Sequence, residues 1–297
     1  MNIQLINFPM KLGCHTEGAD QSFLPLQESE WCTHHTSHVH HVPVNSYPDL
    51  HLEHDQTIMN AILYHQDIVK EVYKNHHFPL SYGGDHTCGV GGSSASLSTF
   101  QDDVTIVWLD AHADSHTQFS SPSKHIHGMP CAILQGLCDE PLRLNHVTPL
   151  SSNRLVYIGL NSYETSEIKH IQEHHIAHLP LADIQSMGLQ ASLDWISENI
   201  KTKYIYLSFD FDVCHPNEFF AVNVNKNSKY TSGQGLKLQE VLHIMTHLFK
   251  TFQCVGCDVV EYNPTLDTHQ HDFKKVLITL DHLVSLIKEN PYDTTSL

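Results

Sequence analysis

The sequence has few basic residues and no long apolar run. Its 16 Lys and Arg residues are outnumbered by 33 Asp and Glu residues, which gives a formal net charge of -17 at pH 7 with His neutral. This charge argues against nucleic acid and anionic membrane surfaces as partners, and it would attract a cationic substrate. No apolar run reaches the length of a membrane span, and the N-terminal sequence has no basic segment ahead of an apolar core. We therefore expect a cytoplasmic protein.

Linkers and nucleotide-binding glycine motifs are also absent. No Pro-, Gly- or Ser-rich segment and no shift in composition divides the 297 residues, so we expect a single domain over residues 1–297. Glycines cluster between positions 83 and 92, but they form neither a P-loop nor a G-x-G-x-x-G pattern. We expect this glycine cluster to give the tight backbone that lets His86 reach a site.

The eight cysteines are expected to be reduced thiols, because the sequence shows no secretion signal. Cys254 and Cys257 have the C-x-x-C spacing of zinc and redox sites. They lie in a predicted strand, however, where residues three apart point to opposite faces. This geometry disfavours a shared ion or a redox pair.

Histidine is unusually abundant, with 27 residues, and seven of them fall between His34 and His54. The segment has no regular ligand period, so we expect a solvated loop, with a short strand at 39–44. A role in storing or acquiring metal remains the alternative.

Alternating strand and helix patterns predict an α/β fold. Helical spacing of apolar residues occurs over 55–75, 128–137, 164–174, 189–200, 236–249 and 272–288. Further strand-like segments are 3–8, 78–81, 104–109, 155–159, 178–181, 204–207 and 253–260. This alternation implies a mainly parallel sheet that helices cover on both faces.

The segment 104–109 carries the first group of metal-type ligands. It is apolar throughout, which is typical of a parallel strand buried on both faces. Asp110, His112 and Asp114 follow at intervals of two residues, so they would point the same way from an extended chain. Ligands of parallel sheets bind at this carboxyl end of the strands.

Two further strand ends carry similar side chains. His86 follows the strand 78–81, and Asp210 and Asp212 follow the strand 204–207. The resulting four carboxylates and two imidazoles are too many for one zinc ion, but they suit two ions such as Mn²⁺ bridged by aspartates. The alternative for the residues after the strand 104–109 is an ordinary loop, and the alternative for Asp210 and Asp212 is a capped turn.

Four motifs together resemble those of the ureohydrolases, the family of arginase, agmatinase and formimidoylglutamase. They are Gly83-Gly84-Asp85-His86, Asp110-Ala-His-Ala-Asp114, Ser208-Phe-Asp-Phe-Asp212 and Asp258-Val-Val-Glu-Tyr-Asn-Pro264. They occur in the order of the family and at roughly its spacing, over nearly the whole chain. The resemblance implies a three-layer α/β/α sandwich that hydrolyses a guanidinium or amidine C–N bond.

The resemblance also implies two Mn²⁺ ions per chain. The ligands of one ion would be His86, Asp110, Asp114 and Asp210. The ligands of the other would be Asp110, His112, Asp210 and Asp212. Two aspartates, Asp110 and Asp210, would therefore bridge the ions, and Asp114 would also accept a hydrogen bond from the nucleophilic hydroxide.

Two further residues match catalytic positions of the family. Glu261 matches the carboxylate that pairs with the guanidinium of the substrate, a planar group suited to two parallel hydrogen bonds. His127, in Lys124-His-Ile-His-Gly-Met-Pro130, matches a proton-shuttling histidine of arginases, and an imidazole can protonate a leaving amine near neutral pH. A surface histidine is the alternative for His127.

The implied substrate contacts depart from the arginase pattern. Arginases hold the α-carboxylate with an Asn, a Ser and a second Asn, and the matching positions here are His116, Ser123 and His125. Two amides are thus replaced by imidazoles, which can still donate to a carboxylate. The acidic residues that hold the α-amino group match Glu164 and Glu167.

We therefore expect an arginase-like enzyme that converts arginine to ornithine and urea. The His-Gly-Met-Pro sequence at 127–130 favours arginase, whereas the two imidazoles and the altered stretch 213–232 leave agmatinase, formimidoylglutamase or another guanidino-acid hydrolase as alternatives. A non-catalytic protein that binds metal or guanidine is a further alternative. Because members of the family commonly form trimers or hexamers, we expect a homo-oligomer.

Overall fold

The computed structural model describes residues 1–44, 54–222 and 234–292. These residues contain a sheet of eight parallel strands in the order β2-β1-β3-β8-β7-β4-β5-β6. The strands are β1 (Ile3–Phe8), β2 (His38–His41), β3 (Phe78–Gly83), β4 (Val104–Leu109), β5 (Leu155–Ile158), β6 (Ala177–Leu179), β7 (Tyr204–Asp210) and β8 (Gln253–Val260). The predicted parallel sheet is confirmed.

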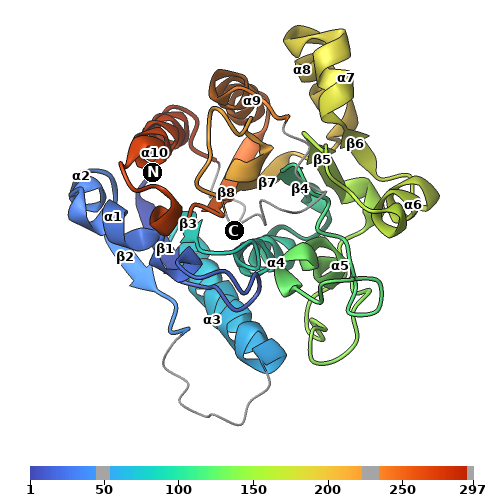
Figure 1. Cartoon of the computed structure of the whole chain (residues 1–297), viewed down its shortest axis with the longest axis horizontal. Coiled ribbons are helices and arrows are strands. Elements are labelled where there is room, and N and C mark those ends of the chain that lie inside the picture. Colours follow the sequence, from blue (N-terminus) through green and yellow to red (C-terminus); the bar gives the residue numbers. More distant parts are fainter. Residues whose placement is uncertain (45–53, 223–233, 293–297) are drawn as a thin grey trace.

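Helices cover both faces of the sheet, with α3, α4 and α5 on one side and α9 and α10 on the other (Figure 1). The longer helices are α3 (His54–Lys74), α4 (Cys88–Phe100), α6 (Thr165–Glu173), α8 (Leu189–Asn199), α9 (Leu238–Thr251) and α10 (His271–Glu289). The shorter ones are α1 (Phe23–Glu28), α2 (Trp31–His35), α5 (Pro130–Leu134) and α7 (Leu181–Met187). The predicted α/β/α sandwich is therefore confirmed.

Several predicted boundaries were wrong. The helix expected over 128–137 is a 3-10 turn, Ile126–Gly128, followed by the short α5. The strand expected over 178–181 is β6, Ala177–Leu179, and the one expected over 39–44 is β2. In each case a short element lies beside polar or irregular residues, so the apolar pattern alone does not define where it ends.

Helix α4 was not predicted, because it lacks a polar face. Eleven of its residues are buried, so no helical period separates apolar from polar positions. Glycines let this helix approach the sheet closely. A Cβ atom on Gly89 would lie 2.7 Å from the Trp108 ring and 2.8 Å from Ser208 Oγ. The glycine cluster was expected to give a tight backbone before His86. Gly84 has this role, because a Cβ atom at this position would overlap the carbonyl oxygen of Met10.

All eight cysteines are free, and seven of them are buried. This agrees with the prediction of reduced thiols. Cys254 and Cys257 lie in β8 and form no bridge. Within the described part of the chain, no helix is both long enough and apolar enough to cross a membrane.

The close approach of α4 to the sheet yields a stability prediction. Gly89→Ala should lower the free energy of unfolding by about 1–3 kcal/mol, because the added methyl must displace a buried indole ring. Ser98→Ala, an exposed change in the same helix, should shift it by less than about 0.5 kcal/mol. Urea unfolding of both variants measures the difference, and equal stabilities would contradict the packing described here.

Candidate metal centre

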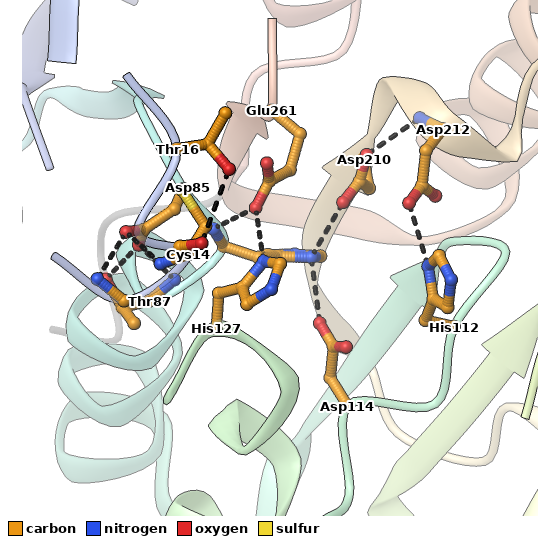
Figure 2. A network of polar contacts seen from close by, with 12 residues as sticks. Cys14, Thr16, Asp85, Thr87, His112, Asp114, His127, Asp210, Asp212 and Glu261 are labelled. Atoms are coloured by element: carbon orange, nitrogen blue, oxygen red, sulfur yellow. Dashed lines mark hydrogen bonds and ion pairs between the residues drawn. The ribbon is translucent and has the colours of Figure 1, made fainter. Parts of the chain in front are cut away.

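The six predicted metal ligands lie at the carboxyl ends of β3, β4 and β7. Figure 2 labels four of them, His112, Asp114, Asp210 and Asp212. Because all strands are parallel, these ends lie along one edge of the sheet. Two sets of three ligand atoms converge among the described residues. One set comes from His86, Asp110 and Asp114, and the other comes from Asp110, His112 and Asp212.

The first set surrounds the Nδ1 atom of His86, whose side chain is almost fully buried. This nitrogen lies 2.9 Å from Asp110 Oδ2, 3.1 Å from Asp114 Oδ2 and 3.2 Å from Asp210 Oδ2. Ligands about 2.1 Å from an octahedral ion are about 3.0 Å apart at right angles. Each of the three oxygens is thus spaced from Nδ1 as a neighbouring ligand of one small dication would be, although only those of Asp110 and Asp114 also converge with it as one group.

A hydrogen-bond chain behind His86 determines which ring nitrogen carries the proton. Ser208 Oγ donates to Asp258 Oδ1 at 2.7 Å, so it accepts the proton of His86 Nε2 at 2.9 Å. Burial raises the pKa of Asp258 to about 6, which leaves it ionised at neutral pH. In neutral His86 the lone pair is therefore on Nδ1, which has no hydrogen-bond partner among the described residues. Burial lowers the pKa of His86, but its contacts with the three carboxylates outweigh this and raise it well above its usual value. The carboxylates thus call for a cation at Nδ1, which is either a proton or a metal ion.

The sheet register explains how this chain forms. Trp108, Ser208 and Asp258 are neighbours in one row across β4, β7 and β8. The Trp108 ring stacks on the imidazole of His86 with centroids 4.1 Å apart and planes at 12°. Its Nε1 atom donates to Asp110 Oδ2 at 2.9 Å. The row therefore orients both a histidine and a carboxylate of the candidate site.

The second set lies beside the first and shares Asp110 with it. Oδ1 of Asp110 lies 3.6 Å from His112 Nδ1, whereas its Oδ2 atom faces His86. Asp212 Oδ2 lies 2.8 Å from the same His112 nitrogen. The two oxygens of Asp110 thus face different ligand sets, which is the arrangement of a carboxylate that bridges two ions.

The ends of β4 and β7 repeat one local structure. Asp110 Oδ1 accepts the backbone N–H of His112 at 2.6 Å, and Asp210 Oδ1 accepts that of Asp212 at 2.7 Å. Each aspartate thereby turns the chain after its strand and presents the residue two positions later. This explains why the spacing of two residues recurs in both motifs.

The aspartates of the site crowd negative charge into a buried space. Burial, and after it the charge of Asp110, raise the pKa of Asp114 to about 7. Burial likewise raises the pKa of Asp212 to about 6 and that of Asp210 well above its usual value. Dications would remove this repulsion, so the donor set and its charge fit two metal ions.

Glu261 and His127 adjoin the first ligand set. Glu261 Oε1 accepts the backbone N–H of His86 at 2.8 Å and lies 3.1 Å from His127 Nδ1 (Figure 2). Burial lowers the pKa of His127, but the hydrogen bond and the charge of Glu261 outweigh this and raise it to about 9. Protonated His127 thus lies next to the first ligand set.

Buried Asp85 ties the loop after β1 to this region. Its carboxylate accepts the backbone N–H groups of Gly13 and Cys14 at 2.8 and 3.2 Å, together with the hydroxyl of Thr87 at 2.5 Å. The carbonyl of Gly13 in turn accepts the N–H of His127 at 3.2 Å. Asp85 therefore positions His127 through the backbone.

Two residues of the site have strained backbones. Asp114 has a φ of 46° and Glu261 a φ of 70°, both in the left-handed region that residues other than glycine rarely adopt. Such strain persists only where the surrounding contacts determine the conformation, and it concentrates at functional sites.

The predicted substrate contacts fall into two places. His116 Nε2 lies 3.6 Å from Glu164 and 3.5 Å from Glu167, so three of them form one group. Glu167 also accepts the backbone N–H groups of Ser115 and Glu164, which caps α6. Their carboxylates thus already have partners within the protein.

The other two lie in the loop before His127. Ser123 is exposed and accepts the N–H of His125 at 3.2 Å. The ring of His125 lies 5.9 Å from that of His127 and 4.9 Å from that of His15. Of the altered stretch 213–232, residues 223–232 lie outside the described residues.

Sequence reasoning assigned no role to Trp108, Ser208, Asp258 or Asp85. Three of these lie inside the quoted motifs, and Trp108 lies two residues before one of them. Their positions in the motifs were the available signal, but the row across the sheet depends on strand order, which the motifs do not specify.

Known proteins resemble this chain over most of its length. A model of the arginase family matches residues 2–283. An arginase from Entamoeba histolytica is 31% identical over 207 residues, which cover 68% of this chain and 67% of that protein. An arginase from Staphylococcus aureus (strain COL) is 30% identical over 228 residues, which cover 75% of this chain and 71% of that protein. A crystal structure of arginase from Bacillus subtilis superposes with a TM-score of 0.81 at 26% identity, covering 97% of this chain and 98% of that one.

The hydrogen-bond chain behind His86 can be tested by metal affinity. Ser208→Ala should weaken the binding of Mn²⁺ about 10–100-fold, because Nε2 loses the acceptor that keeps the lone pair on Nδ1. Thr202→Ala, which removes a hydroxyl at the other end of the same sheet, serves as control and should bind Mn²⁺ as the parent does. Calorimetric titration of metal-free protein decides between them, and unchanged affinity in Ser208→Ala would refute the tautomer argument.

Proposed function

The chain belongs to the arginase family, and from this premise we propose that it is a binuclear, Mn²⁺-dependent hydrolase that converts arginine to ornithine and urea. The observation that carries the proposal is the division of the Asp110 carboxylate between two ligand sets, with the lone pair of His86 facing one of them. Two bound dications supply Lewis acidity that generates a nucleophile from water at neutral pH.

The ligand assignment follows these two sets. We assign one ion to His86, Asp110, Asp114 and Asp210. We assign the other to Asp110, His112, Asp210 and Asp212. The contacts of Asp110 support its bridging role directly, whereas the second oxygen of Asp210 accepts the N–H of Asp212.

Glu261 would orient the substrate. Its carboxylate is buried beside the first ligand set, and a guanidinium can donate two parallel hydrogen bonds to such a group. This would hold the planar carbon of the substrate in a fixed direction relative to Asp114. The strained backbone of Glu261 supports such a positioning role.

His127 would deliver a proton to the nitrogen that leaves. Breaking the C–N bond leaves an electron pair on that nitrogen, and protonation by an imidazolium makes it a neutral amine. The contact with Glu261 keeps His127 protonated near neutral pH, which suits this task.

The residues assigned to the far end of the substrate differ from those of arginases, and one observation favours a second candidate. His116 already contacts Glu164 and Glu167, the residues that would hold an α-amino group. Ser123 and His125 would bind the carboxylate from the neighbouring loop. Agmatine, formimidoylglutamate or another guanidino acid is therefore the alternative substrate. A protein that binds metal or guanidine without turnover is a third possibility.

The organisation of the whole chain is also part of the proposal. We propose that residues 1–297 form a single arginase-like domain and that the protein is a cytoplasmic homo-oligomer, a trimer or hexamer. Light scattering on the purified protein measures the oligomeric state.

Turnover of a substrate panel tests the proposed function. We expect Mn²⁺-loaded protein to release urea from arginine faster than from agmatine or guanidino acids, and to release no formamide from formimidoylglutamate. A higher kcat/KM on another member of the panel would reassign the substrate. No turnover of any of them, with metal bound, would contradict a hydrolase and favour the binding protein.

Two variants separate metal binding from proton transfer. Asp110→Ala should lose bound Mn²⁺ and turnover together, because both ligand sets contain this carboxylate. His127→Ala should keep two ions per chain and lower kcat about 10²–10⁴-fold. Metal analysis and steady-state kinetics distinguish the two outcomes.

The pH profile adds a second readout for His127. With a pKa of about 9, its proton is present below pH 9 and lost above it, so kcat/KM should decline on the alkaline side. His127→Ala should lack this decline. An alkaline limb that persists unchanged in the variant would show that another group donates the proton.

A further inference from the structure

The histidine-rich segment forms part of the sheet edge. Strand β2, His38–His41, is the outermost strand and pairs only with β1 among the described residues. Side chains alternate along a strand, so His38 and His40 share one face while His41 is on the other. The sequence of this segment shows no regular spacing of ligands, but the strand places two alternate histidines on the same face.

We propose that His38 and His40 form a surface site for a borderline transition-metal dication of the Zn²⁺, Ni²⁺ or Cu²⁺ class, separate from the candidate metal centre. Their rings lie side by side, with centroids 4.4 Å apart and planes at 79°. His38 is exposed, whereas His40 is half-buried. Imidazole nitrogens are preferred ligands of these ions.

A chain of hydrogen bonds fixes the tautomer of His40. Ser37 Oγ donates to the carbonyl of Ile3, so it accepts from Gln4 Nε2 at 2.7 Å. This orients the Gln4 amide with its Oε1 atom toward His40 Nε2, 3.0 Å away. A carbonyl oxygen can only accept, so Nε2 of His40 carries the proton.

The consequence is that the lone pair of neutral His40 is on Nδ1. Ligand histidines are commonly held in this way, with the second ring nitrogen donating to an oxygen behind it. Burial lowers the pKa of His40, and the neighbouring His38 and His41 lower it further, so the ring stays neutral and able to bind a metal ion. His38 supplies the second nitrogen, and water would complete the coordination.

The neighbouring His41 provides a matched control. It is one residue away, but its Nδ1 atom lies 3.1 Å from Asn7 Nδ2 and its ring packs edge-on against Phe23. It belongs to the opposite face of β2 and cannot join a chelate with His38. His170 in α6 and His174 directly after it, with centroids 4.6 Å apart, form a second surface pair for comparison.

Site-resolved footprinting tests the proposal on the full, Mn²⁺-loaded chain. Diethylpyrocarbonate modifies free imidazole, so bound Zn²⁺ should protect its ligands, and mass spectrometry reads each histidine separately. We expect Zn²⁺ to protect His38 and His40 at one shared midpoint and to leave His41 reactive. Protection only at other histidines, for example at His170 and His174, would overturn the proposal.

Variants test whether the two rings act together. His40→Ala should abolish the protection of His38, and His38→Ala that of His40, whereas His41→Ala should leave both protected. Independent protection of either ring in the absence of the other would overturn the chelate. Thermal melting of each variant confirms that β2 remains folded.

Changes at Gln4 test the tautomer argument. Gln4→Leu removes the acceptor and should raise the zinc concentration at half-protection about tenfold. Gln4→Glu keeps an oxygen toward Nε2 and should retain the parent midpoint or lower it. Equal weakening in both variants would show that an oxygen facing Nε2 does not hold the tautomer, which would overturn the orientation proposed for His40.

Discussion

One imidazole nitrogen facing three carboxylates is the constraint that organises this end of the sheet. In neutral His86, Ser208 and Asp258 keep the ring proton on Nε2, so the lone pair of Nδ1 faces the carboxylates. Buried carboxylates repel one another and resist ionisation, so such an arrangement is unstable without positive charge. The stacked Trp108 and the strained Asp114 are held against this same point. The fold thus fixes a geometry that a pair of cations would complete.

The parallel sheet makes this constraint possible. Strands β4, β7 and β8 are adjacent and in register, so side chains far apart in the sequence form a single row beneath the ligands. Helix α4 packs over that row because Gly89 has no side chain to hold it away. The ligands themselves follow the strand ends, where the chain leaves the sheet and can turn. Strands β4 and β7 therefore contribute both to the packed row and to the ligands at the strand ends.

Much of this was accessible from the sequence, and the limits have physical causes. Strands buried on both faces, such as 104–109, are long apolar runs, and β1, β4 and β8 were predicted at their observed bounds. Ligand spacing could be read because Asp110 and Asp210 each turn the chain in the same way. Helix α4 was missed because burial on all sides removes the amphipathic period, and Ser208 and Asp258 had no assigned role because strand order is not encoded locally. That His38 and His40 lie on the same face follows only from the strand conformation of β2, which their sequence spacing does not establish.

The measurement that tests the central claim most directly is an anomalous diffraction map of the Mn²⁺-soaked crystal. The account predicts two manganese peaks per chain, one within bonding distance of His86 Nδ1 and the other of His112 Nδ1, with Asp110 between them. A single peak, or none beside His86, would contradict it.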